Sequence, residues 1–263
     1  MNTDFDFILF GHNASEVEKA VSAGIRSFMV DCEWRGKNER QVGADTEIAP
    51  TEISSVRAVS DIAQARPYCR INGFGHWTPS EVEHAINCGA KRIFLPMAES
   101  PEEVEHFLQQ LDKRAEAAIL VETEGAVRCL RSLANLPIDA VYVGLNDLAI
   151  SRGSRSIFAA VADGTVERVR EAFPSIHFGF GGITVVDAGL PVPCRMLMKE
   201  MARLGCSFGF MRRSFRRDIE GLNMKDELNK LYAYWSKLLH RTRPEIVSDH
   251  EELIKLIQQA GLG

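Results

Sequence analysis

Eight short apolar segments recur along the chain, and polar stretches of helical character separate them. Each segment is short and rich in Val, Ile and Phe, and its apolar character is nearly continuous. They are residues 5–10, 27–32, 68–72, 92–96, 117–122, 140–144, 177–181 and 207–211. Such runs are typical of parallel strands that are covered on both faces. The chain therefore reads as a series of β-then-α units.

The stretches between these segments carry start and stop signals of helices. Residues 78–81 (TPSE) and 100–103 (SPEE) both have the pattern of a capping box with proline at the first helical position. Gly24, Gly89 and Gly205 each follow a helical pattern and lead into the next apolar segment. Glycine at such a position adopts the left-handed conformation that ends a helix.

Eight β-then-α units in series predict a closed α/β barrel, the (β/α)8 TIM barrel. The length of 263 residues suits one such barrel. No glycine-rich dinucleotide fingerprint follows the first segment, which disfavours an open doubly wound sheet. Residues 33–50 read as a long polar loop, and 248–260 as an extra amphipathic helix after the break at Pro244. We predict one domain, 1–263, in which 244–263 is a C-terminal helical extension.

Composition and charge exclude several classes of protein. With 31 basic and 36 acidic residues the net charge is −5, which disfavours nucleic acid and acidic membrane surfaces as partners. No apolar run approaches the ~20 residues that span a bilayer, and the N-terminal segment lacks the pattern of a signal peptide. The six cysteines are scattered without a CxxC pair, so we expect free thiols. We expect a cytoplasmic location.

Active sites of such barrels lie at the carboxyl ends of the strands. The polar and other candidate side chains at those ends are His12, Asp31, Glu33, Arg70, His76, Met97, Glu122, Glu124, Asn146, Asp147, Thr184, Arg212 and Arg213. Glu122 and Asp147 end neighbouring segments, and Arg70 ends the third. Two carboxylates form an oxygen-rich site for Mg²⁺ or Mn²⁺ if water or a chelating substrate completes the coordination. From spacing alone, a helix-capping role for both carboxylates stays equally open.

Two sequence blocks, 121–127 (VETEGAV) and 138–149 (IDAVYVGLNDLA), contain these carboxylates. Shorter blocks precede them at 31–33 (DCE), 69–72 (CRIN) and 95–100 (LPMAES). In these blocks the chain resembles the HpcH/HpaI aldolase and citrate lyase β-subunit family. The resemblance is good over roughly residues 20–155 and holds only in outline beyond.

The resemblance implies a role for each residue of the site. Glu122 and Asp147 would ligate the divalent metal, and a 2-oxo acid such as pyruvate or oxaloacetate would chelate it. The substrate-binding residues would be Arg70, Gly144, Leu145, Asn146 and Asp147. A metal ion and a guanidinium stabilise the enolate that forms when a bond next to a carbonyl is cleaved. A salt bridge inside the barrel is the alternative role for Arg70.

One position departs from the family pattern. Aldolases of the family have D-x-E-H after the second strand, and that histidine is their acid/base. This chain has Trp34 there, and an indole cannot transfer the proton. The candidate catalytic residues are therefore Arg70, Glu33, His12 and His76. Metal-bound water is a further candidate base, and either histidine alone also fits an exposed loop position.

The resemblance implies a metal-dependent carbon–carbon lyase, an aldolase that joins or splits a 2-oxo acid and an aldehyde. Alternatives are a citrate-lyase-like or malyl-CoA-like lyase or thioesterase, an oxaloacetate decarboxylase, and a non-catalytic metabolite-binding barrel. The arginine-rich run 212–217 (RRSFRR) fits a phosphate or CoA site, or a surface or subunit contact.

The C-terminal extension bears on assembly. Its amphipathic segment must bury an apolar stripe, because a short isolated helix is marginal in water. Members of the resembled family form trimers or hexamers in which C-terminal helices pack on neighbouring subunits. We therefore expect a homo-oligomer in which this tail, or the helix before it, crosses to a second chain.

Overall fold

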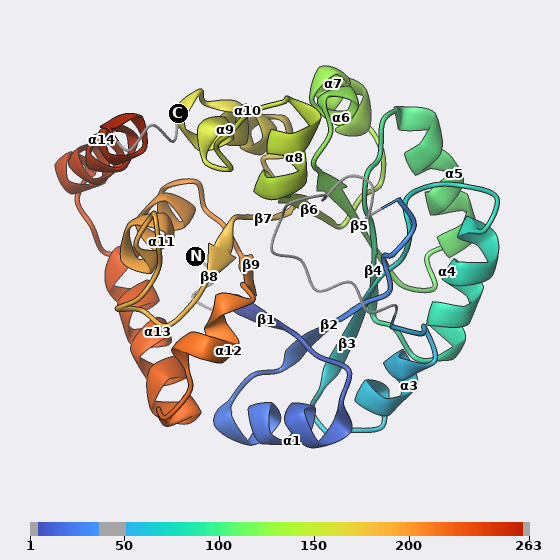
Figure 1. Ribbon diagram of the computed structural model, residues 1–263. Coiled ribbons are helices and arrows are strands. Elements are labelled where there is room, and N and C mark those ends of the chain that lie inside the picture. Colours follow the sequence, from blue (N-terminus) through green and yellow to red (C-terminus); the bar gives the residue numbers. More distant parts are fainter. Residues whose placement is uncertain (1–4, 37–50, 260–263) are drawn as a thin grey trace.

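The computed structural model describes residues 5–36 and 51–259. In this part of the chain nine parallel strands form a nearly closed barrel, and the helices surround it (Figure 1). The strands are β1 (Asp6–Phe10), β2 (Ser27–Asp31), β3 (Arg66–Arg70), β4 (Arg92–Leu95), β5 (Glu116–Val121), β6 (Ala140–Val143), β7 (His177–Phe180), β8 (Gly182–Ile183) and β9 (Phe208–Met211). Each predicted segment overlaps a strand, so the predicted (β/α)8 TIM barrel is confirmed.

The ninth strand arises because the seventh barrel position is broken in two. β7 pairs with β6, whereas β8 pairs with β9. Gly181 lies between them with a φ of 67°, a backbone conformation that favours glycine. Below the break, the amide of Ser207 donates to the carbonyl of Phe178 at 2.9 Å and links β7 to the last strand. The barrel therefore has eight positions around its axis.

The outer layer consists of helices that follow the strands. They are α1 (Ala14–Ala23), α3 (Ser55–Ser60), α4 (Thr78–Asn87), α5 (Pro101–Leu111), α6 (Glu124–Arg128), α7 (Leu130–Leu133), α8 (Leu145–Ser151), α9 (Ala159–Ala162), α10 (Thr165–Ala172), α11 (Cys194–Arg203), α12 (Ser214–Asp218), α13 (Met224–Leu238) and α14 (Arg243–Gln259). Gly24, Gly89 and Gly205 have positive φ angles, as predicted for helix ends.

Neither predicted capping box forms in full, and at α5 only the serine half is present, because the Glu103 carboxylate accepts from the amide of Glu99 instead of that of Ser100. Ser100 caps α5, and its hydroxyl accepts from the amide of Glu103. The prediction for α4 is wrong, because the capping residue is Trp77 and makes no side-chain cap bond. Thr78 accepts instead from the amide of Gly75, and Glu81 binds a residue of the preceding strand end, as described below.

The core has two parts, one between the barrel and its helices and one inside the barrel. The inner core contains Ile8, Met29, Tyr68, Phe94, Ala118, Leu120, Ala140, Tyr142, Phe208 and Phe210. Side chains alternate between the inside and the outside along each strand. The next inward position on a strand therefore lies at the carboxyl-end mouth. These positions are Phe10, Asp31, Arg70, Pro96, Glu122, Gly144 and Arg212. Gly182 pairs with Phe210 and therefore also faces inward, beside Arg212.

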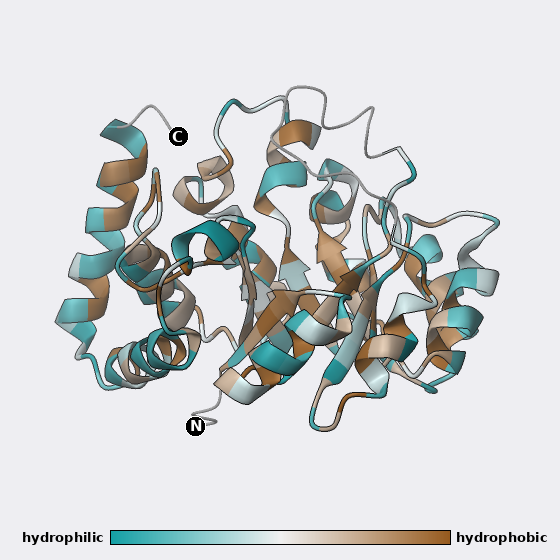
Figure 2. Cartoon of the chain, turned by 60° about the horizontal axis from the view of Figure 1, so that its bottom comes forward, coloured by the Kyte–Doolittle hydropathy of each residue, from teal (hydrophilic) through white to brown (hydrophobic). Residues whose placement is uncertain are grey.

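The C-terminal helix is longer than predicted. It begins at Arg243 rather than near 248, because Pro244 lies in its first turn, where a missing N–H needs no partner. α14 packs on α11 and α9 of its own chain, and Leu253 and Ile257 are buried there. Figure 2 shows its alternating apolar and polar residues. The apolar stripe thus has a partner within the chain, so it no longer argues for a second subunit. The homo-oligomer stays a prediction.

The cysteines, the helices and the loop 33–50 are also the subject of predictions. All six cysteines are free thiols, and five of them are buried. Among the described residues, no helix combines the length and the apolar character needed to cross a bilayer. Most of the predicted polar loop 33–50 lies outside the described residues, because only 33–36 belong to them.

Candidate active site

Arg70 is held by two carboxylates at the mouth of the barrel. Its Nε donates to Oδ1 of Asp31 at 2.8 Å and its Nη2 to Oδ2 at 2.6 Å, so the pair is bidentate. Its Nη1 lies 3.3 Å from Oε2 of Glu33. Burial alone would lower the pKa of Arg70, but the charges of Asp31 and Glu33 raise it well above its ordinary value. The guanidinium is therefore charged and fixed in orientation.

Glu122 is the most deeply buried carboxylate of the mouth, with 2% of its surface exposed. Its Oε1 accepts from the amide of Met97, at the end of the neighbouring strand, at 3.0 Å. Burial, followed by the negative charges of Asp147 and Glu33, raises the pKa of Glu122 to about 8. This carboxylate is thus oriented but poorly compensated.

Asp147 lies in the first turn of α8 and is 8% exposed. Its negative charge and that of Glu33 act on Glu122, and the nearby guanidinium of Arg70 is already bound by Asp31. A divalent cation fits such a place because it would relieve the repulsion between the carboxylates. In the described part of the chain no group of three or more His, Cys, Asp or Glu is arranged for a metal ion. A cation here would therefore take two protein carboxylates and complete its shell with water or substrate.

Trp34, which follows Glu33 after β2, forms a stack with two other side chains. Its ring faces the guanidinium of Arg35 at 4.4 Å, and Arg35 faces the ring of Trp77 at 4.3 Å. The side-chain carbonyl of Asn72 accepts from the amides of Trp34 at 2.9 Å and Arg35 at 2.8 Å. Glu81 on α4 in turn accepts from the amide and side chain of Asn72. The indole thus has a structural role and stays 43% exposed.

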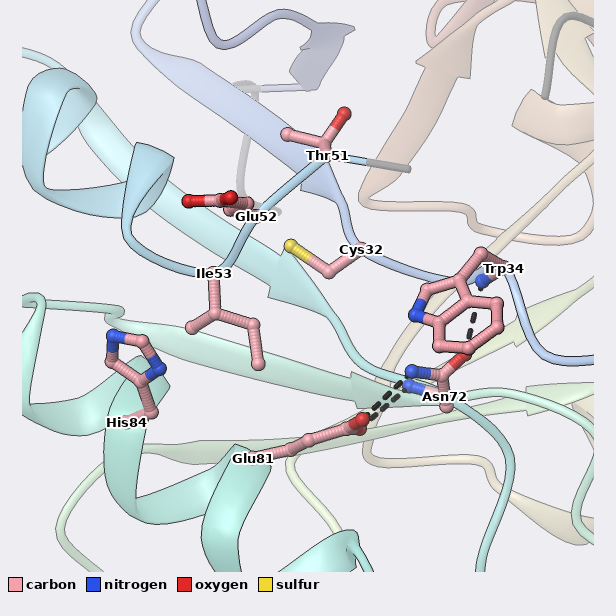
Figure 3. Close-up of a pocket in the computed structure, with 8 residues that line it drawn as sticks. All are labelled: Cys32, Trp34, Thr51, Glu52, Ile53, Asn72, Glu81 and His84. Atoms are coloured by element: carbon pink, nitrogen blue, oxygen red, sulfur yellow. Dashed lines mark hydrogen bonds between the residues drawn. The ribbon is translucent and has the colours of Figure 1, made fainter. Parts of the chain in front are cut away.

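A hollow of about 290 Å³ lies beside Trp34 and Asn72. Figure 3 shows it between the ends of β2 and β3 and the helices α3 and α4. It is lined by Cys32, Trp34, Thr51, Glu52, Ile53, Asn72, Glu81 and His84. The sequence interpretation missed it, because its walls come from three separate stretches of the chain. The residues that bind the side chains of Arg70 and Glu122 do not line this hollow. Cys32 and Trp34, which do line it, are sequence neighbours of Asp31 and Glu33.

Comparison with solved structures identifies the same fold in other proteins. An HpcH/HpaI aldolase/citrate lyase family protein from Burkholderia cenocepacia J2315 superposes with a TM-score of 0.62 at 15% identity, over 90% of this chain and 95% of that one. An HpcH/HpaI aldolase from Desulfitobacterium hafniense DCB-2 gives 0.61 at 14% identity, over 92% and 95%. The citrate synthase SbnG gives 0.60 at 16% identity, over 90% and 94%. The chain shares their fold.

At this level of identity the likeness to the HpcH/HpaI fold concerns the architecture alone. No protein-family model matches the chain. No curated protein matches it either. Residue roles at the mouth must therefore be argued from this chain's own geometry.

In the described part of the chain, neither candidate histidine forms a hydrogen bond or ion pair with the carboxylates of the mouth. His12 is exposed after β1. His76 is exposed too, and its ring packs edge-on against Trp77 at 4.6 Å. It lines a separate apolar hollow of about 330 Å³ with Phe74 and His106. Neither contacts Arg70 or Glu122 among the described residues.

Two further candidates have structural partners. Glu124 forms an ion pair with Arg152 of α8. Thr184 donates to Asp218 at 2.6 Å. The residues that the structure brings together at the mouth are thus Asp31, Glu33, Arg70, Glu122, Gly144 and Asp147. Of the contacts that orient them, the Met97 amide was not predicted, since a backbone donor leaves no sequence signal.

Proposed function

We propose that this protein is a lyase that forms or breaks a carbon–carbon bond of a 2-oxo acid, such as pyruvate or oxaloacetate, with an aldehyde as the second partner. It would use a divalent cation, Mg²⁺ or Mn²⁺, held by Glu122 and Asp147. One observation carries the proposal. The buried carboxylate of Glu122, whose pKa is raised by burial and by the negative charge of Asp147, lies near a guanidinium that Asp31 fixes, at the mouth where barrels of this kind place their chemistry.

Each residue has a defined task in this proposal. The Met97 amide keeps the carboxylate of Glu122 turned toward the mouth. A bound cation would supply Lewis-acid stabilisation of the negative charge that develops on the substrate's keto oxygen. Arg70 donates to the same oxygen through N–H groups on Nη1 and Nη2 that Asp31 does not use. The first amides of α8, from Leu145 through Asn146, lack partners within the helix and would receive the substrate carboxylate.

Proton transfer is assigned to Glu33. Trp34 cannot carry the proton, and His12 and His76 are exposed. Glu33 is 5% exposed, lies beside Arg70, and acts electrostatically on Glu122. A carboxylate so placed can accept the proton of a substrate hydroxyl when the carbon–carbon bond breaks.

The test compares the two proposed metal ligands with Glu124, a control glutamate that follows the same strand as Glu122. We expect Glu122→Ala and Asp147→Ala to abolish pyruvate release from 4-hydroxy-2-oxo acids and to abolish stabilisation by Mg²⁺ or Mn²⁺ in thermal unfolding. Glu124→Ala, which removes only the surface pair with Arg152, should keep both. Full activity of either variant at limiting metal would refute the site.

A second candidate, decarboxylation of oxaloacetate, is favoured by the fixed position of Trp34. Loss of CO₂ leaves the same enolate but requires no base for a substrate hydroxyl. Evolution of CO₂ from oxaloacetate, without pyruvate release from hydroxy-oxo acids, would select this candidate.

A further inference from the structure

Arg212 is the inward residue that follows the last barrel strand, β9. Phe210, two residues earlier, belongs to the core inside the barrel, so the alternation of the strand turns Arg212 into the mouth. Its side chain lies across Gly182, where an added Cβ would approach the Cβ of Arg212 to 2.9 Å. Its Nη2 reaches Gly189, 2.7 Å from the place of a Cβ there. Two glycines thus make room for this one arginine.

Arg212 differs from the other arginines of its run. Arg216 is paired with Glu16 and Arg217 with Asp218, and both side chains are exposed. In the stretches 5–36 and 51–259, by contrast, Arg212 has no ion pair, and its Nε is buried without a hydrogen-bond acceptor. A buried donor without an acceptor is costly unless a ligand supplies one. A guanidinium recognises carboxylate or phosphate through paired hydrogen bonds.

The position of Arg212 separates it from the metal-binding side of the mouth. Two strand positions, β6 and the broken β7/β8, lie between β5 and β9, so the strand that precedes Glu122 and the strand that precedes Arg212 are three spacings apart. At about 4.8 Å for each spacing, a ligand that reaches both places spans on the order of 10 Å across the curved mouth. A three-carbon 2-oxo acid held near Glu122 and Arg70 is too short to reach Arg212. The group that meets Arg212 therefore belongs to the other half of the substrate.

We propose that Arg212 binds an anionic group, phosphate or carboxylate, on the aldehyde partner, an inference that rests on the proposed function. Arg212 then determines specificity and takes no part in enolate formation. The enzyme should accordingly prefer an aldehyde with a negative charge at the end distant from the carbonyl.

The experiment separates the two halves of the substrate. With Mg²⁺ or Mn²⁺ present, exchange of the pyruvate methyl protons with solvent deuterium reports enolate formation without an aldehyde. Aldol addition is then measured with glyceraldehyde 3-phosphate against glyceraldehyde, and with 4-oxobutanoate against butanal. We expect Arg212→Leu to lower kcat/KM for the preferred anionic aldehyde by about 10- to 100-fold, the effect of losing a charged hydrogen bond. Its neutral counterpart and the deuterium exchange should be unchanged.

Controls make each outcome informative. Arg217→Leu removes the same charge from a side chain that is 79% exposed and should change neither substrate. Arg212→Lys should restore part of the preference, because it keeps the charge and loses the fork geometry. If wild type exchanges pyruvate protons but Arg212→Leu keeps the preference, or wild type shows no preference for either anion, the inference is wrong. Absence of exchange in wild type would overturn the proposed function and the inference with it.

Discussion

Gly144 and Glu122 fit together at the mouth only because Gly144 has no side chain. A Cβ on Gly144 would overlap Oε2 of the Glu122 carboxylate. We therefore expect Gly144→Ala to push this carboxylate aside, to weaken Mg²⁺ or Mn²⁺ binding and to lower kcat by about 10- to 100-fold, as the loss of an orienting contact does. Metal titrations followed by calorimetry and steady-state kinetics measure both effects.

The matched control is Gly11→Ala, at the end of β1. There the new methyl group would be 3.6 Å from its nearest neighbour, an ordinary contact. Equal losses in the two variants would mean that alanine harms this barrel generally and that Gly144 has no special relation to Glu122.

The raised pKa of Glu122 makes the stability of the metal-free protein depend on pH. Between its ordinary pKa of 4.5 and its folded pKa of about 8, the folded state holds a proton that the unfolded state has lost. Stability therefore falls as pH rises through this window, by up to about 1.4 kcal/mol per pH unit. Glu122→Gln removes the titration, so its free energy of unfolding should change less between pH 5 and pH 8. Urea unfolding with a chelator present measures the slopes, and parallel slopes would contradict the assignment.

The bidentate pair between Arg70 and Asp31 predicts two graded effects on catalysis. Arg70→Lys keeps the charge but cannot bind Asp31 and the substrate in the same plane. We expect kcat to fall by at least ~10²-fold, as for the loss of an oxyanion donor. Asp31→Asn leaves the guanidinium present but less well held, and we expect a fall of about 10-fold. Changes in KM alone would show that Arg70 binds substrate without stabilising the enolate.

The burial of Leu253 within its own chain predicts how the tail contributes to stability. Leu253→Ala should lower the free energy of unfolding by about 2–5 kcal/mol, the usual cost of a buried cavity. The exposed neighbour in the same helix, Lys255→Ala, should change it by less than about 0.5 kcal/mol. Because the contact lies within one chain, the loss of stability caused by Leu253→Ala should not depend on protein concentration. A concentration-dependent loss, or smaller assemblies on deleting 244–263, would instead place this helix on a second subunit.

The barrel could be predicted from the sequence because each strand is covered on both faces and so keeps a continuous apolar run. The break at Gly181 could not, since residues 177–182 (HFGFGG) offer three glycines and only the closed barrel decides which one turns. The failed capping box at Thr78 has a similar cause. Glu81 had the right spacing for the box, but Asn72 offered it a tertiary partner.

The candidate site was predictable to the extent that strand ends determine it. Arg70, Glu122 and Asp147 follow from the rule that chemistry lies at the carboxyl ends of the strands. The support of Arg70 by Asp31 follows from strand register, because the two residues are direct partners in β2 and β3. The stack of Trp34, Arg35 and Trp77 was not predictable, since it depends on how two loops meet in space.

The interruption at Gly181 also bears on how such a mouth can diversify. Below it, the hydrogen-bonded frame of the barrel is closed by the contact between Ser207 and Phe178. Above it, the two-residue strand β8 leads into the loop that faces Arg212. Insertions and substitutions in that loop need not disturb the hydrogen bonds between β6 and β7, because β8 pairs with β9 alone and Gly181 interrupts the strand between β7 and β8. Preferences for new aldehyde partners could thus evolve on the side of the mouth that carries Arg212, while Glu122 and Asp147 stay in place.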